Sequence, residues 1–397
     1  MNEKTRILST VSMYHAINDG SISVIPILFP ILKTAFDLSY TQVGIITSSG
    51  LLLTLIAQII IGRISDGKNC LSYLSMGVLL ISFSMLLVTQ SKGFFTLMLF
   101  MLLLRFSASF FHPIGTGWIS RIFKKDRLDW AMGVQSGFAD VGGFVAVLTT
   151  LYVTELTSWD FPLYVWSIAG AIILITGLFL SRNVNDVFLC AKKNNEKQNL
   201  KEALTEAFEF MKKIKILIPG LMISGAAWGT VITYLPLLLD EKTTLSLSHI
   251  GFVVAIWIGI GSIVSFYYGR ISRLLGRRKV IVLAYLTIGI VGILLVFLTN
   301  ILILILLMVL LGLGVFVTYP ALSSFISEIT DEAVEGRTFG IIFTFQLGGG
   351  TLLLLLGGVL SDLYGIWMPF AILGTVSLII AILLIINYRS PILQPKL

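Results

Sequence analysis

The sequence predicts an all-α polytopic membrane protein whose twelve transmembrane helices form two parallel-repeat six-helix bundles. Hydrophobic residues make up 56% of the 397 residues and charged residues only 12%, with a mean hydropathy of +0.95. Soluble domains carry about 25% charged residues, so this chain has too little polar surface to be covered by water. The number of long apolar runs and an internal repeat lead to the same prediction.

Twelve apolar runs along the chain are each near the length of about 20 residues that crosses roughly 30 Å of hydrocarbon. The predicted spans are 7–33, 41–61, 71–89, 94–116, 130–152, 162–180, 214–239, 247–268, 279–298, 301–325, 338–360 and 367–387. A charged stretch separates the sixth span from the seventh. We therefore expect a first bundle over residues 1–180, a cytoplasmic linker over 181–213 and a second bundle over 214–397.

The linker contains an amphipathic segment. Its apolar residues recur at spacings of three and four, which is typical of one face of a helix. They are Leu200, Ala203, Leu204, Ala207, Phe208 and Met211. Lys and Glu occupy much of the other face, so we expect a helix that lies in the membrane interface and tethers the two bundles.

Basic residues are distributed unevenly between the two sides of the predicted membrane. All but four of the 28 Lys and Arg residues lie in the termini or connections of one side. The exceptions are Lys33, Lys92 and Lys242 on the other side and Arg105 inside a span. The positive-inside rule then places both termini in the cytoplasm and the protein in the cell membrane. The net charge of +7 belongs to loops that face anionic headgroups and does not indicate nucleic-acid binding.

The two six-span halves match at a fixed spacing of 207 residues. GRIS at 62–65 recurs at 269–272, and LSYTQVG at 38–44 corresponds to LSLSHIG at 245–251. Several matches in one register indicate a duplication. Because six spans is an even number, the copies share one orientation, which predicts a pseudo-twofold axis along the membrane normal.

Four short motifs resemble those of a known family. Residues 62–68 read GRISDGK, which is similar to the G-x-x-x-D-(R/K)-x-G loop between spans two and three of the major facilitator superfamily, with the basic and glycine positions displaced. NDG at 18–20, LSYTQVG and FHPIGTG at 111–117 further resemble the fosmidomycin-resistance type of efflux transporter. The resemblance implies a twelve-helix transporter that exports a small drug-like or metabolite molecule against inward proton flow.

The loop motif implies a conformational gate that includes Gly62 and Asp66. Asp66 is expected near the start of span three, where the positive end of the helix favours a carboxylate. Arg337, which opens span eleven, is expected as its basic partner on the cytoplasmic side. The alternative is that these residues lie in solvated loops with no fixed partner.

Three normally charged residues fall near the middle of predicted spans: Asp19, Arg105 and Asp140. Each costs roughly 2.5–3.5 kcal/mol at mid-helix, so we expect opposite charges or an aqueous cavity around them. His15 lies one turn before Asp19 and His112 lies two turns after Arg105, so helical spacing brings both histidines to the same cluster. We assign proton coupling to Asp19, Arg105, Asp140, His112 and His15, with Arg105 between the two carboxylates.

The second half lacks this cluster. At the spacing of 207 residues, Asp19 corresponds to Ala226 and Arg105 to Gly312. A cluster that only held six helices together would be expected in both halves. The asymmetry predicts ion handling in the first half and a neutral, aromatic binding surface in the second. The candidate substrate-binding residues of the two halves are Asn18, Gln135, Trp228, Tyr234, Tyr319 and Gln346.

These features predict a secondary active transporter rather than an enzyme. The sequence has no nucleotide-binding glycine loop and no metalloprotease histidine pair, and we expect no cofactor and no resident metal. We expect a monomer in the lipid bilayer that exchanges a small molecule for protons by alternating access. Two alternatives use the same residues: uptake of a small organic anion with Arg105 as counter-ion, and divalent metal transport with the His and Asp side chains as ligands. A sensor would bind a ligand without moving it.

Overall fold

The structure is a computed structural model that describes residues 2–65, 69–123, 125–182, 184, 208–212, 214–328 and 335–387. Internal contacts divide the chain into two compact units. Unit 1 comprises Met1–Lys193 and Leu239–Ala255, and unit 2 comprises Asn194–Leu238 and Ile256–Leu397. Eleven helices of the described ranges are long and apolar enough to cross a membrane, and the bent pair α1 and α2 brings the total to twelve. The predicted twelve-span, all-helical fold is confirmed.

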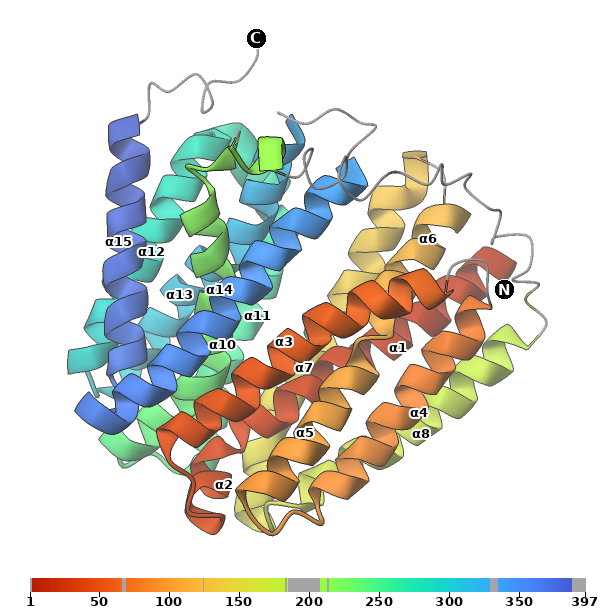
Figure 1. Ribbon diagram of the computed structural model, residues 1–397, viewed down its shortest axis with the longest axis horizontal. Coiled ribbons are helices and arrows are strands. Elements are labelled where there is room, and N and C mark those ends of the chain that lie inside the picture. The colour runs from red at the N-terminus through yellow and green to blue at the C-terminus, as the bar shows by residue number, and fades with distance from the viewer. Residues whose placement is uncertain are drawn as a thin grey trace. The chain divides into compact units, whose positions relative to one another are not determined.

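Unit 1 contains the helices drawn from red to yellow-green in Figure 1. They are α1 (Glu3–Ile27), α2 (Phe29–Ala35), α3 (Tyr40–Ser65), α4 (Cys70–Val88), α5 (Phe94–Ala108), α6 (Gly117–Ile122), α7 (Lys125–Leu156) and α8 (Phe161–Ser181). Helix α1 packs against α7 and α8, and α4 packs against α5 and α8. The α1–α7 contact positions the candidate site, because its residues come mainly from these two helices and from the end of α5.

The first predicted span is bent rather than straight. Helices α1 and α2 meet at Leu28 with an angle of 49° between them. Pro26 lies in the last turn of α1 and Pro30 in the first turn of α2. Each proline lacks a backbone donor and crowds the preceding turn, which explains the bend.

The fourth predicted span is interrupted in its second half. Helix α5 ends at Ala108, a π-helical turn follows over His112–Thr116, and α6 completes the span. Pro113 lies in the first turn of the π-helix and cannot donate to an i−4 carbonyl. A π-helical turn inside a span is frequent at functional sites. His112 therefore begins a distorted segment and not a regular α-helix.

Unit 2 contains most of α10 (Ile218–Lys242) and α11 (Leu247–Leu275), together with four further helices. These are α12 (Arg277–Phe297), α13 (Ile301–Glu328), α14 (Glu335–Tyr364) and α15 (Met368–Ile386). Helix α12 packs against α13 and α15. Unlike span four, α13 continues as one helix through Pro320.

The end of α10 and the start of α11 belong to unit 1 by their contacts. The Glu155 carboxylate accepts a hydrogen bond from the Ser248 backbone N–H at 2.7 Å. The Tyr40 hydroxyl donates to Glu241. The division of the chain at a linker over 181–213 stays a prediction, since most of that segment and Leu200–Ala207 of its predicted helix lie outside the described residues.

Glycines produce the same close helix crossing in each unit. A Cβ at Gly142 of α7 would lie 2.1 Å from the Ala16 carbonyl oxygen of α1, and a Cβ at Gly349 of α14 would lie 2.2 Å from the Met222 carbonyl oxygen of α10. The two glycines are 207 residues apart. Only glycine permits this approach, so the internal repeat of the sequence extends to its helix packing.

Candidate functional site

His15 is the centre of a polar cluster in unit 1. Its side chain is buried, and its Nδ1 is 3.1 Å from the Gln135 carbonyl oxygen of α7. Its Nε2 lies 3.5 Å from Asp19 Oδ2, one turn further along α1. The backbone carbonyl can only accept, so Nδ1 carries the proton in this contact and Nε2 faces the carboxylate.

Asp19 is the more accessible partner. Its side chain is 30% exposed, whereas that of His15 is 6% exposed. The buried Asn18 amide donates to Asp19 Oδ1 at 2.9 Å, which leaves Oδ2 facing His15. The predicted i, i+3, i+4 face of the first span therefore exists, and it presents one carboxylate with two polar neighbours.

Arg105 is buried near Asp19 without touching it. The guanidinium lies within electrostatic range of Asp19, yet no carboxylate is within 4 Å of it among the described side chains. Its Nε is buried and has no hydrogen-bond partner, and its aliphatic stem packs on Gly50, where a Cβ would lie 2.9 Å from Arg105 Cγ. The buried guanidinium and Asp19 therefore attract each other through space rather than through a fixed ion pair.

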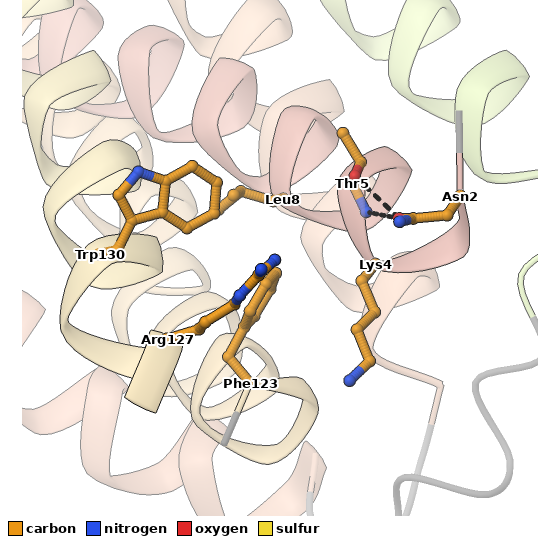
Figure 2. Close-up of a pocket in the computed structure, with 7 residues that line it drawn as sticks. All are labelled: Asn2, Lys4, Thr5, Leu8, Phe123, Arg127 and Trp130. Atoms are coloured by element: carbon orange, nitrogen blue, oxygen red, sulfur yellow. Dashed lines mark hydrogen bonds between the residues drawn. The ribbon is translucent and has the colours of Figure 1, made fainter. Parts of the chain in front are cut away.

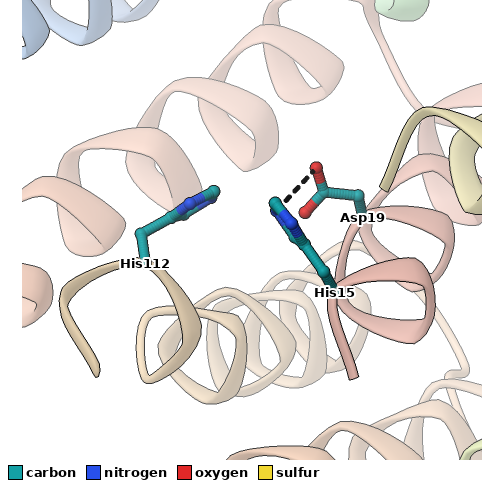
Figure 3. A group of neighbouring side chains, drawn as sticks. All are labelled: His15, Asp19 and His112. Carbon is teal, nitrogen blue, oxygen red and sulfur yellow. Dashed lines mark ion pairs between the residues drawn. The ribbon is translucent and has the colours of Figure 1, made fainter. Parts of the chain in front are cut away.

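The two histidines approach each other through an aromatic contact. The rings of His15 and His112 are 5.3 Å apart and nearly perpendicular, and Figure 3 shows His15 between His112 and Asp19. Phe111 stacks on His15 with a centroid distance of 4.0 Å. Phe111 is not among the predicted site residues. It is the first residue of the FHPIGTG motif, so the signal was present.

The remaining unit 1 candidates lie on α7. Gln135 is buried, and its amide donates to the Ser136 hydroxyl at 2.8 Å while its backbone carbonyl holds His15. Asp140 is half-buried, two residues before the Gly142 crossing with α1. Arg105 is in electrostatic range of Asp19, and its position between two carboxylates stays a prediction.

Three side chains of the cluster have the geometry of a cation site. His15, Asp19 and His112 each offer one ligand atom, and these atoms lie within 4.8 Å of one another. The Nδ1 contact of His15 with a backbone carbonyl leaves Nε2 directed at the other two groups, which is the arrangement that usually orients a metal-binding histidine. The cluster can therefore bind protons or, with small side-chain movements, a divalent cation.

The unit 2 candidates occupy different environments. Trp228 is half-buried next to Trp257, with ring centroids 6.2 Å apart. Gln346 is buried, and its amide donates to the Ser224 hydroxyl at 3.1 Å. Tyr319 is 41% exposed and lies against Phe343.

Tyr234 differs from the other candidates because none of its surface is exposed. Its hydroxyl donates to the Leu354 carbonyl oxygen of α14. It therefore packs α10 against α14 and offers no surface to a ligand in this conformation.

The predicted gate is only partly described. Gly62 of α3 lies against Pro113. A Cβ added at position 62 would be 3.4 Å from the Cβ of Pro113. Asp66 and the side chain of Arg337 lie outside the described residues. The ion pair between them stays a prediction.

A twelve-span helical chain with duplicated halves and a titratable cluster inside one of them has the architecture of a polytopic membrane transporter. The family model of the Major Facilitator Superfamily matches residues 11–241 and 217–396. The chain belongs to this superfamily. The predicted superfamily is confirmed, and it is a family of transporters rather than of enzymes.

Curated relatives include a multidrug resistance protein and a proton-coupled antiporter flippase. The multidrug resistance protein MdtG of Proteus mirabilis is 28% identical over 169 residues, which cover 40% of each protein. The proton-coupled antiporter flippase LtaA of Staphylococcus haemolyticus is 25% identical over 262 residues, 64% of this chain and 60% of that relative. The matched stretches thus span less than two thirds of these relatives. The narrower fosmidomycin-resistance subfamily stays a prediction.

Solved structures support the fold. The nucleoside transporter NupG superimposes with a TM-score of 0.78 at 13% identity and covers 98% of this chain and 100% of that one. An inward-facing bacterial homologue of the human lysosomal transporter Spinster gives 0.75 at 16% identity, covering 98% and 96%. At these identities the likeness concerns the fold alone.

Proposed function

We propose that this protein exports a small drug-like or metabolite molecule by alternating access and is driven by inward proton flow. The observation that carries the proposal is the cluster inside unit 1 in which the half-buried Asp19 lies near the buried His15 and Arg105. Similarity to a multidrug resistance protein and to a proton-coupled antiporter flippase supports outward transport coupled to protons. The charge distribution supports a cell-membrane protein with both termini in the cytoplasm. We propose that it acts as a monomer.

The coupling step follows from the charges of the cluster. With Asp19 ionised, its negative charge compensates the buried Arg105 guanidinium, and desolvation of the two opposite charges is partly offset. A proton that binds Asp19 removes this compensation and leaves a buried positive charge that favours water or a ligand acceptor. Asp19 is the accessible member of the cluster, so it receives the proton, and His15 relays or stabilises it.

The substrate contacts are proposed in both halves. Asn18 and Gln135 border the proton cluster, and both are buried amides with donor and acceptor atoms. Trp228, Tyr319 and Gln346 supply an aromatic and amide surface in unit 2, which suits a flat, weakly polar molecule. Such a division lets the proton site change its charge without altering the surface that selects the substrate.

The direct test is transport in reconstituted vesicles with an imposed pH gradient. Asp19→Asn and Asp140→Asn each keep a polar side chain of similar size but cannot release a proton. We expect gradient-driven transport to be lost in Asp19→Asn and reduced in Asp140→Asn, while substrate exchange without a gradient persists. Full gradient-driven transport in both variants would refute the proton-site assignment.

One observation favours a second candidate function. The ligand atoms of His15, Asp19 and His112 lie within 4.8 Å of one another, so the substrate could be a divalent metal ion. In that case Zn²⁺ or Mn²⁺ would raise the melting temperature of the native protein, and the rise would vanish in a His15→Ala/His112→Ala variant. If neither Zn²⁺ nor Mn²⁺ changes the melting temperature of the native protein, divalent metal transport is ruled out.

Uptake of an organic anion is distinguished by the role of Arg105. If the guanidinium binds the substrate, Arg105→Lys should raise KM and leave the proton dependence of transport unchanged. If it serves the proton site, the same variant should shift the pH profile with little change in KM.

A further inference from the structure

A pocket of about 290 Å³ lies at the end of unit 1 where the chain begins. It is lined by Asn2, Lys4, Thr5, Leu8, Phe123, Arg127 and Trp130. The pocket opens between the first turn of α1 and the first turns of α7 (Figure 2). It is separate from the proton cluster, and nothing in the proposed transport function uses it.

The lining has two chemically different sides. In Figure 2 the Trp130 ring lies on the side of Leu8, while Lys4 and Asn2 lie on the opposite side. Leu8 and Phe123 are buried and form an apolar wall, and Trp130 adds an indole that is 58% exposed. Lys4 and Arg127 are exposed cations with no carboxylate within 4 Å among the described side chains. A ligand for this pocket needs an anionic head and an apolar body.

The position of the pocket along the membrane normal follows from the helices that form it. In the sequence of α7, which begins at Lys125, the charged residues of the first turns end at Asp129 and an apolar stretch starts at Trp130. Arg127 is therefore on the polar side of the boundary and Trp130 is at the boundary, where tryptophan is enriched in membrane proteins. On α1, Lys4 is polar and Leu8, one turn later, is the first apolar wall residue. Both helices cross from water into hydrocarbon at the level of this pocket.

We infer that the pocket binds the headgroup of an anionic phospholipid. Its phosphate would lie between Lys4 and Arg127, and the glycerol and upper acyl chains would lie along Trp130 and Leu8. Basic pockets between transmembrane helices on the cytoplasmic side suit such headgroups, and the volume is close to the lower limit of known small-ligand sites. The lipid would join α1 to α7, the two helices that His15 and Gln135 also connect inside the unit.

The test is a thermal-shift titration of the full chain in detergent. Dioleoyl phosphatidylglycerol should raise the melting temperature at concentrations where dioleoyl phosphatidylcholine does not. Each cation near an anionic lipid contributes affinity equivalent to about fivefold, so Lys4→Gln should weaken half-saturation about fivefold and Lys4→Gln/Arg127→Gln about 25-fold. Trp130→Leu should also weaken the binding of phosphatidylglycerol relative to the native protein. This variant removes no charge, so the loss would come from the missing interfacial indole.

Two comparisons decide the result. Lys92→Gln removes an exposed lysine outside the pocket and should leave the phosphatidylglycerol response unchanged. Inorganic phosphate should give no shift, since it lacks the apolar body. The inference is overturned if the two lipids act equally, if the double glutamine variant retains the native response, or if inorganic phosphate alone reproduces it, which would identify a free-phosphate site.

Discussion

Helices α5 and α13 occupy corresponding places in the two halves, and one position shows how differently the halves use them. In α5 this position is Arg105, a buried cation whose stem lies on Gly50. In α13 it is Gly312, where a Cβ would lie 2.7 Å from the Trp257 carbonyl oxygen of α11. Unit 1 thus keeps a charge where unit 2 has a close helix crossing. Unit 2 folds without a charge at this position, which supports our proposal that the charge in unit 1 serves transport.

Other positions are alike in the two halves. Gly142 and Gly349, which are 207 residues apart, both permit a helix to approach another backbone. Packing was therefore retained in both copies, while ionisable groups remain in one. Substitutions can separate the helix crossings that both units share from the charged cluster that unit 1 alone contains.

The largest effect is expected from removing both charges of the first half. Asp19→Ala/Arg105→Gln leaves no uncompensated charge, so the protein should fold with nearly the native melting temperature. Transport driven by a pH gradient should fall at least about 100-fold, the rate equivalent of ~2.7 kcal/mol. The measurement is flux in vesicles, with Asp37→Asn as a control in an exposed turn. Asp37 has φ of 51°, a conformation that asparagine also adopts. Native transport in the double variant would show that the cluster is structural.

The next effect concerns the shared crossing. Gly142→Ala places a methyl group against the Ala16 carbonyl and should lower the free energy of unfolding by about 1–3 kcal/mol. Gly349→Ala should do the same in unit 2. Gly137→Ala, on α7 with no atom within 4 Å of its Cβ, should be neutral or stabilising. Thermal unfolding in detergent measures all three. If only one of Gly142→Ala and Gly349→Ala lowers the stability, the two helix crossings are not equivalent.

A smaller effect is expected at the aromatic surface of unit 2. Trp228→Leu removes the contact with Trp257 and one face for a bound substrate. An aromatic pair contributes about 0.5–1.5 kcal/mol, so KM should rise about two- to tenfold. The dependence on the pH gradient should stay native. Phe266→Leu replaces an aromatic side chain that is 81% exposed and serves as control. A changed gradient dependence in Trp228→Leu would mean that both halves handle protons.

The smallest effect is expected at Tyr234. Tyr234→Phe removes the hydrogen bond to the Leu354 carbonyl and should lower the free energy of unfolding by about 1 kcal/mol. KM should not change, because the ring is fully buried. If KM rises without a loss of stability, Tyr234 contacts substrate in another conformation.

The twelve spans could be predicted from the sequence because hydrocarbon thickness fixes their length and composition. The duplication was readable from GRIS and the glycines in one register. Pro26, Pro30 and Pro113 indicate from the sequence where helices can bend, but not that one place becomes a break at Leu28 and the other a π-helical turn. Periodicity gives faces along a continuous helix, and it carries no information where the helix is interrupted.

The candidate site was predictable in part for the same reason. His15, Asn18 and Asp19 share a face because α1 is continuous there. Placing Arg105 and His112 on one face because they are seven residues apart requires an unbroken helix, whereas α5 ends at Ala108. The contact between His15 and Phe111 depends on how α1 packs against the interrupted span, which no local pattern encodes.

The π-helical turn over His112–Thr116 also has a consequence for how span four evolved. Such a turn accommodates one extra residue without unravelling the helix, so it behaves as a tolerated insertion. Deleting one residue there would restore regular winding and rotate everything beyond it by about 100°. Trp118, now fully enclosed, would swing toward a different neighbour. One residue of chain length thus determines which way the side chains of the last third of this span face.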